Sequence, residues 1–150
     1  MGLAQRLDLD LKEAMKAREA GRARLSVLRL LKAAAKNEEV RLGRPLSEDE
    51  WLAAVSREVR QREEARPDLE RSGRSEIVAK LDEEVRLLRQ YLPEPMGPAE
   101  LAKVVAEAAH EMGASGKGDL GRMMGALIPR LRGRVDGNAL RQAVERQLGG

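Results

Sequence analysis

The residues that favour β-strands are scarce in this chain, and their scarcity limits the folds it can adopt. Among 150 residues there is no Thr and no Phe, and there are only 2 Ile and 10 Val, against 22 Leu and 21 Ala. Leu and Ala favour helices, whereas β-branched and aromatic residues favour strands. We therefore predict an all-α fold whose core is rich in Leu and Ala.

Apolar residues recur at spacings of three and four, which is the period of an amphipathic helix. Glycine and proline stop signals divide this pattern into seven expected helices. Their apolar stripes place Met15 of the first helix and Ile77 of the fourth on the buried side. The expected helices cover about residues 3–20, 25–42, 48–66, 75–92, 98–112, 119–131 and 137–148.

The start of the third helix carries the clearest local signal. Ser47 and Glu50 have the spacing of a capping box, in which each side chain accepts a hydrogen bond from the backbone amide of the other residue. Leu46 and Trp51 occupy the two positions of a hydrophobic staple. We interpret Trp51 as a structural anchor of this helix start rather than a binding residue.

Helix breakers concentrate between the fourth and fifth helices. Pro93, Pro95, Gly97 and Pro98 fall within six positions, which is too many for a helix interior. This composition predicts a linker over 93–98. It separates an N-terminal domain of four helices, residues 1–92, from a C-terminal domain of three helices, residues 99–150.

The side-chain inventory excludes most enzyme chemistries. The chain has no Cys, one His (His110), one Trp and one Tyr, so thiol catalysis, a Cys- or His-rich metal site and an aromatic platform for stacked bases are excluded. We expect no catalytic residue, cofactor or metal ion. The longest stretch without charge, residues 123–129, is too short to span a membrane, and no signal peptide is visible, so we expect a cytoplasmic protein.

Two glycine-rich features lie near the sixth helix. The run 113–118 resembles a phosphate-binding loop, but Lys117 is followed by Gly rather than Ser or Thr and no strand precedes it. We interpret it as a connector, with a single phosphate held by Lys117 and free amides as the alternative. Gly121 and Gly125 share one helix stripe and predict close approach of another backbone, by packing or by contact.

Basic residues dominate the C-terminal end. From residue 114 onward there are seven basic and three acidic side chains, an excess larger than the +3 of the whole chain. We predict that this region contacts the phosphates of a nucleic acid. The candidate residues are Lys117, Arg122, Arg130, Arg132 and Arg134. A second basic group is better explained by ion pairs on helix surfaces; it comprises Arg22, Arg24, Arg29 and Lys32.

Several segments together resemble the YqeY family. They are 14–18, 25–38, 59–62, 73–74 and 91–93, followed by the more specific 113–115, 119–125 and 135–137. The resemblance implies four N-terminal helices joined to a three-helix domain similar to the GatB tail domain of the aspartyl/glutamyl-tRNA amidotransferase. In that enzyme the tail helps to engage tRNA, and a separate domain performs the chemistry.

The resemblance implies a non-catalytic accessory protein that binds tRNA or another structured RNA. Two alternatives stay open. One is a helical protein-interaction module that docks on an amidotransferase or an aminoacyl-tRNA synthetase. The other is a component of a carbon-nitrogen ligase with glutamine as amide donor, acting with a partner that supplies the active site.

Overall fold

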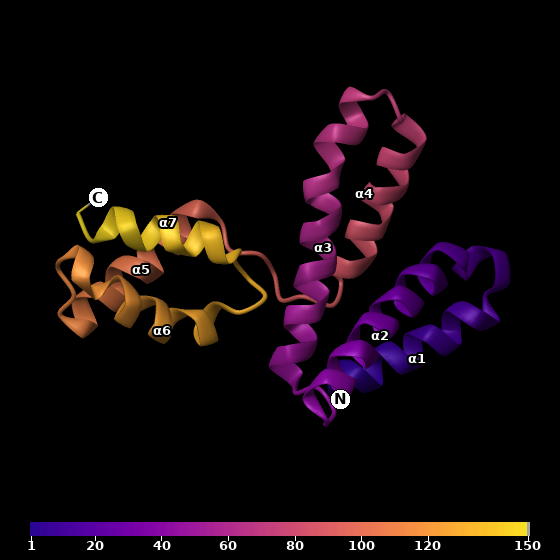
Figure 1. The fold of residues 1–150 in the computed structure, drawn as a ribbon, viewed down its shortest axis with the longest axis horizontal. Helices are drawn as coiled ribbons and strands as arrows, with labels where there is room; N and C mark the ends of the chain where they lie inside the picture. Colours follow the sequence, from indigo (N-terminus) through magenta and orange to yellow (C-terminus); the bar gives the residue numbers. More distant parts are fainter. Residues whose placement is uncertain (150) are drawn as a thin grey trace. The chain divides into compact units, whose positions relative to one another are not determined.

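The chain is all-α, as its composition predicts. A computed structural model describes residues 1–149, and no β-strand occurs among them. The chain divides into two compact units, one over Met1–Leu92 and the other from Pro93 onward. The elements in chain order are α1 (Leu3–Lys16), η1 (Arg18–Gly21), α2 (Arg22–Leu42), α3 (Glu48–Arg71), α4 (Ser75–Arg89), α5 (Pro98–Met112), η2 (Lys117–Asp119), α6 (Leu120–Leu131) and α7 (Gly137–Gln147), where η marks a short 3-10 helix (Figure 1).

Unit 1, residues 1–92, consists of two helical hairpins. Figure 1 shows α1 beside α2 and α3 beside α4. The core contains the first half of α1 and of α3, the middle of α2 and the end of α4. Representative fully buried residues are Leu7, Leu31, Val55 and Leu88. The end of α1, the start of α2, the end of α3 and the start of α4 therefore extend beyond the shared core.

The turn between α1 and α2 differs from the expected one. The first helix ends at Lys16 rather than near residue 20, because Arg18 adopts a left-handed conformation with a φ of 52° and a 3-10 turn follows. At the end of this turn Gly21 lies against the backbone of Ala14. A Cβ atom added to Gly21 would lie 2.2 Å from the Ala14 carbonyl oxygen, so the turn needs a glycine there.

The predicted helix end before Pro67 is wrong, because α3 continues through this residue to Arg71. Proline removes one backbone donor, and the position is exposed, where that loss is tolerated best. Ion pairs with α4 support this end of α3: Arg62 lies 3.2 Å from Glu84, and Arg66 lies 2.8 Å from Asp82.

Two apolar positions lie on the other side of their helices from the one predicted. Met15 is 53% exposed and Ile77 is 41% exposed. Both lie beyond the part of unit 1 in which the two hairpins share a core, so no second hairpin covers them. On α4, Val78 and Glu84 are buried instead. The buried Glu84 carboxylate is tolerated because Arg62 pairs with it.

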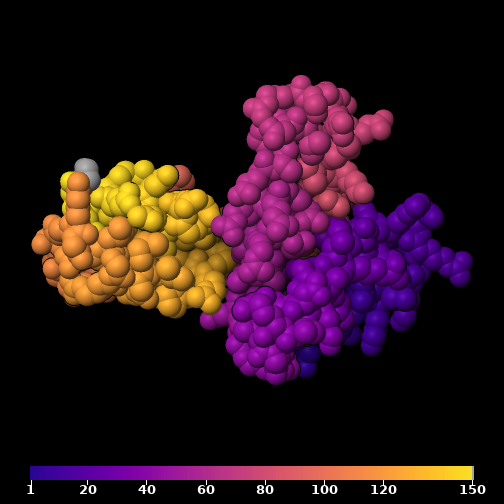
Figure 2. Space-filling view, viewed as in Figure 1, coloured from indigo at the N-terminus to yellow at the C-terminus, as the bar shows by residue number. Residues whose placement is uncertain are grey.

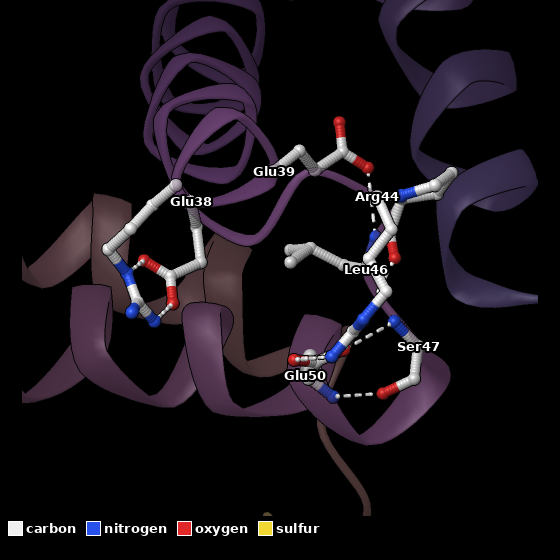
Figure 3. A network of polar contacts seen from close by, with 8 residues as sticks. Glu38, Glu39, Arg44, Leu46, Ser47 and Glu50 are labelled. Atoms are coloured by element: carbon white, nitrogen blue, oxygen red, sulfur yellow. Dashed lines mark hydrogen bonds and ion pairs between the residues drawn. The ribbon is translucent and has the colours of Figure 1, made fainter.

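The capping box at the start of α3 is confirmed. The Glu50 amide donates to Ser47 Oγ at 3.2 Å, and the Ser47 amide donates to Glu50 Oε1 at 2.9 Å. Arg44 adds a two-pronged contact to the Glu50 carboxylate, and the Leu46 amide donates to Glu39 (Figure 3). These contacts lower the pKa of Glu50 to about 2, with the bond from Arg44 as the largest cause. Trp51 is buried, in agreement with its predicted anchoring role.

The end of unit 1 is fastened to its beginning by Tyr91, a contact that spans most of the unit's sequence. The Tyr91 hydroxyl donates to Asp10 Oδ2 at 2.5 Å, and Arg24 lies 3.0 Å from the same oxygen. The Arg6 guanidinium lies 4.8 Å from the centre of the Tyr91 ring. Burial, and then the bond to Asp10, raise the pKa of Tyr91.

Unit 2 packs α5, α6 and α7 around a small apolar core. Val105, Met123, Leu127 and Val144 are buried in its centre. Pro98 lies in the first turn of α5, as predicted. No helix within residues 1–149 is long and apolar enough to cross a membrane.

Candidate nucleic-acid interface

The loop between α5 and α6 is closed by a carboxylate from its own chain. Asp119 Oδ2 accepts hydrogen bonds from the amides of Ser115, at 3.1 Å, and Gly116, at 3.4 Å, and Arg122 donates to Oδ1 at 3.1 Å. The bond from Ser115 and then that from Arg122 are the main causes that lower the pKa of Asp119. Two of the amides expected to be free for a phosphate are therefore already occupied.

Two of the predicted phosphate-binding residues have side chains that are free to bind an external anion. Lys117 and Arg130 are exposed, and within residues 1–149 neither side chain makes a hydrogen bond or an ion pair. Lys117 begins the 3-10 turn before α6, and Arg130 lies in the last turn of α6. Both can meet an external anion without breaking an internal contact.

The other three candidates are placed differently. Arg122 is exposed and donates to the Met112 carbonyl at 3.0 Å as well as to Asp119. Arg132 is partly exposed at the C-terminal end of α6. Arg134 donates to the Glu94 carbonyl at 3.0 Å and to Glu100 at 3.2 Å. The role of all three in binding phosphate stays a prediction.

Arg134 also has a structural function that sequence reasoning missed. Its carbonyl accepts a hydrogen bond of 2.9 Å from the Met96 amide, while its guanidinium holds the Glu94 carbonyl. Together these bonds fasten the segment before α5 to the turn after α6. No local sequence pattern predicts this contact, because Arg134 and Glu94 lie 40 positions apart.

The candidate residues do not converge on one point. Lys117 precedes α6 and Arg130 is near its end, and a helix of 12 residues is about 18 Å long. The candidate residues therefore extend along α6, with Lys117 before the helix and Arg130 near its end. A single bound phosphate cannot contact both, but a polyanion can.

The surface of α6 between these cations carries two exposed glycines, beside Ile128, which is 41% exposed. Gly121 and Gly125 are exposed, and a Cβ atom added to either would have no neighbour within 4 Å. The packing interpretation of these glycines is therefore wrong within residues 1–149, whereas the contact interpretation is left open. Pro129 is exposed on the same side of the helix by its spacing. The backbone of α6 is accessible to a partner along this face.

The lone histidine does not belong to this interface. His110 is exposed in the last turn of α5. Groups of three or more side chains able to hold a metal ion are not found in the described part of the chain.

The family profile of Yqey-like proteins matches residues 4–148. The chain belongs to the YqeY family. The match extends over both units of this YqeY-like protein, so the resemblance first seen in separate blocks holds along nearly the whole sequence. No curated protein matches the chain.

Proposed function

We propose that this YqeY-like protein binds structured RNA, and tRNA in particular, along α6, as an accessory protein without chemistry of its own. The observation that carries the proposal is the pair of exposed glycines on α6, with Lys117 before the helix and Arg130 near its end. The resemblance of the C-terminal domain to an amidotransferase tail supports tRNA as the RNA.

The exposed glycines are costly for the helix itself. Glycine inside a helix is about 1 kcal/mol less favourable than alanine. Gly121 and Gly125 have open space around them, so no internal contact compensates for this cost. Close contact between a partner and the helix backbone explains why glycine occupies these two positions.

An RNA backbone is a suitable partner for such a face. Duplex RNA is recognised mainly by its shape and its phosphates, across a wide and shallow minor groove. The two glycines let sugars and phosphates approach the helix backbone closely at their positions, and Lys117 and Arg130 reach phosphates at the two ends. Such contacts need neither aromatic stacking nor reading of bases, for which this chain is poorly equipped.

The first test measures tRNA binding by the full chain over a series of salt concentrations. Each phosphate contact contributes about 0.7 to 0.9 to the slope of log K against log salt. The Lys117→Ala and Arg130→Ala variants should each weaken binding and reduce the slope by about that amount. Lys103→Ala, which removes an exposed cation on α5, is the matched control and should change little.

A glycine variant tests the glycine positions themselves. Gly125→Gln replaces an exposed helical glycine with a better helix former, so it should raise the stability of unit 2. It should at the same time weaken tRNA binding, because the new side chain stands where the RNA backbone approaches. Binding that is unchanged in both Gly125→Gln and the Lys117/Arg130 double variant would refute this site. Amide transfer to mischarged tRNA by the purified chain would refute the accessory role.

A further inference from the structure

The outward face of α2 carries charges that the fold of unit 1 does not use. Before its first acidic residue, Glu38, this helix has five basic side chains. Arg24 pairs with Asp10 at 3.0 Å, and Lys32 pairs with Asp8, so both are satisfied by α1. The remaining three basic residues are Arg22, Arg29 and Lys36.

Those three residues are spaced by seven, which aligns them along one face of the helix, about 10 Å apart. Within residues 1–149, the side chains of Arg29 and Lys36 make no hydrogen bond or ion pair. Arg22 has only a 3.8 Å contact with Glu19 between two highly exposed side chains, a kind of pair that contributes little. Smaller residues separate the cations on the same face: Ser26, Ala33 and Val40.

The same face of α2 also carries exposed apolar side chains. A shallow hollow, open to solvent, is lined by Leu25 and Leu30 together with Arg22, Ser26 and Arg29. Leu30 is 52% exposed, and Val40, further along, is 72% exposed. The core takes the opposite side of α2, and the residues of this face are exposed from Arg22 to Val40. The two hairpins of unit 1 also stand apart at their far ends in the space-filling view (Figure 2).

We propose that this α2 face docks an acidic amphipathic helix of a partner protein. Carboxylates at every seventh position of that helix would meet Arg22, Arg29 and Lys36, and its apolar residues would enter the hollow beside Leu25 and Leu30. Seven residues is also the period with which two helices pack side by side, with charged pairs beside the seam setting partner choice. Guanidinium groups pair with carboxylates in a two-pronged geometry that fixes register.

A protein helix fits this face better than RNA does. Phosphates would satisfy the cations but would leave Leu30 and Val40 without apolar contact, whereas a helix with apolar anchors covers both kinds of side chain. This surface lies in unit 1, and the proposed RNA interface lies in unit 2. The two proposals can therefore fail independently.

The test uses the full chain and a synthetic amphipathic peptide as long as α2, with Glu at every seventh position and Leu and Ala between. We expect binding in the micromolar range, measured by fluorescence anisotropy, with NMR shift changes confined to α2. The double variant Arg29→Glu with Lys36→Glu should weaken binding about tenfold or more, because two attractions become repulsions. A second peptide with Lys in place of Glu should bind that variant better than it binds the original chain.

The matched control reverses two exposed lysines on α1 whose side chains also make no internal contact, by Lys12→Glu with Lys16→Glu. It makes the same change in net charge and should leave peptide binding within about twofold. Equal binding of the acidic and basic peptides to the original chain would overturn the proposal. So would loss of tRNA binding in the α2 variant without any peptide binding, which would make this face a nucleic-acid surface.

Discussion

Replacing Gly21 by Ala tests the turn on which the α1–α2 hairpin depends. The φ of Gly21 is −97°, which alanine can adopt, so the effect of the substitution is steric rather than conformational. The new Cβ would lie 2.2 Å from the Ala14 oxygen and 2.9 Å from two other backbone atoms. Carbon–oxygen contacts are normally about 3.3 Å or longer, so the backbone must move by about 1 Å.

Forcing extra atoms into a packed site typically costs about 1–3 kcal/mol. We expect Gly21→Ala to fall near the upper end, at about 2–3 kcal/mol, because the opposing atoms belong to the backbone and cannot turn away. With a urea dependence of about 1–2 kcal/mol per molar, the unfolding midpoint should fall by about 1–3 M.

Trp51 gives a selective readout of this change. It is the only Trp in the chain and is buried in unit 1, so urea unfolding followed by its fluorescence reports on that unit. Gly125→Ala is the matched control, because the same substitution there meets open space in unit 2. It should leave the Trp51 transition unchanged. A midpoint for Gly21→Ala within about 0.3 M of the parent chain would refute the close approach of Gly21 to Ala14.

Other substitutions give further checks. Gly125→Ala should stabilise unit 2 by about 0.5–1 kcal/mol, measured by circular dichroism, because helix propensity improves without a clash. The pKa of Glu50 is lowered in the folded state, so the contribution of its carboxylate to folding stability is present above the ordinary pKa of Glu and is lost as pH falls toward about 2. Glu50→Gln should therefore flatten that part of the acid unfolding profile. The pKa of Tyr91 is raised, so the contribution of its hydroxyl to folding stability is complete below about pH 10 and is lost as pH rises through the folded-state pKa. Tyr91→Phe should therefore remove this loss of stability at alkaline pH, measured by Trp51 fluorescence. Arg134→Ala should speed proteolysis next to Glu94, because the segment before α5 loses its side-chain anchor.

Local signals in the sequence were enough to predict the order of the helices and the start of α3, but not the ends of α1 and α3. Ser47 and Glu50 lie three positions apart, so their reciprocal bonds depend on a few backbone angles and not on the rest of the fold. Pro98 at the start of α5 is predictable for the same reason. Propensity and capping act over one or two turns, which is the range that a linear pattern contains.

Features that depend on a distant partner could not be predicted. Nothing in the sequence separates Arg24, which pairs with α1, from Arg29, which makes no such contact; only the fold sorts them. The same holds for Gly121, whose open surroundings reverse the usual interpretation of a glycine stripe as a packing seam. Arg134 is one of the predicted phosphate contacts but also anchors Glu94.

The outer half of the α3–α4 hairpin is held by ion pairs as well as by the buried Val78. Beyond Val59, α3 contributes no residue to the core of unit 1, and ion pairs such as Arg66 with Asp82 join it to α4. Exposed ion pairs weaken as salt rises, whereas buried apolar contacts do not. Amide hydrogens in this half should therefore exchange with solvent sooner than those near Val55, and the difference should widen with salt. The hairpin tip can open locally while the rest of unit 1 stays folded, so a single free energy of unfolding does not describe every part of this unit.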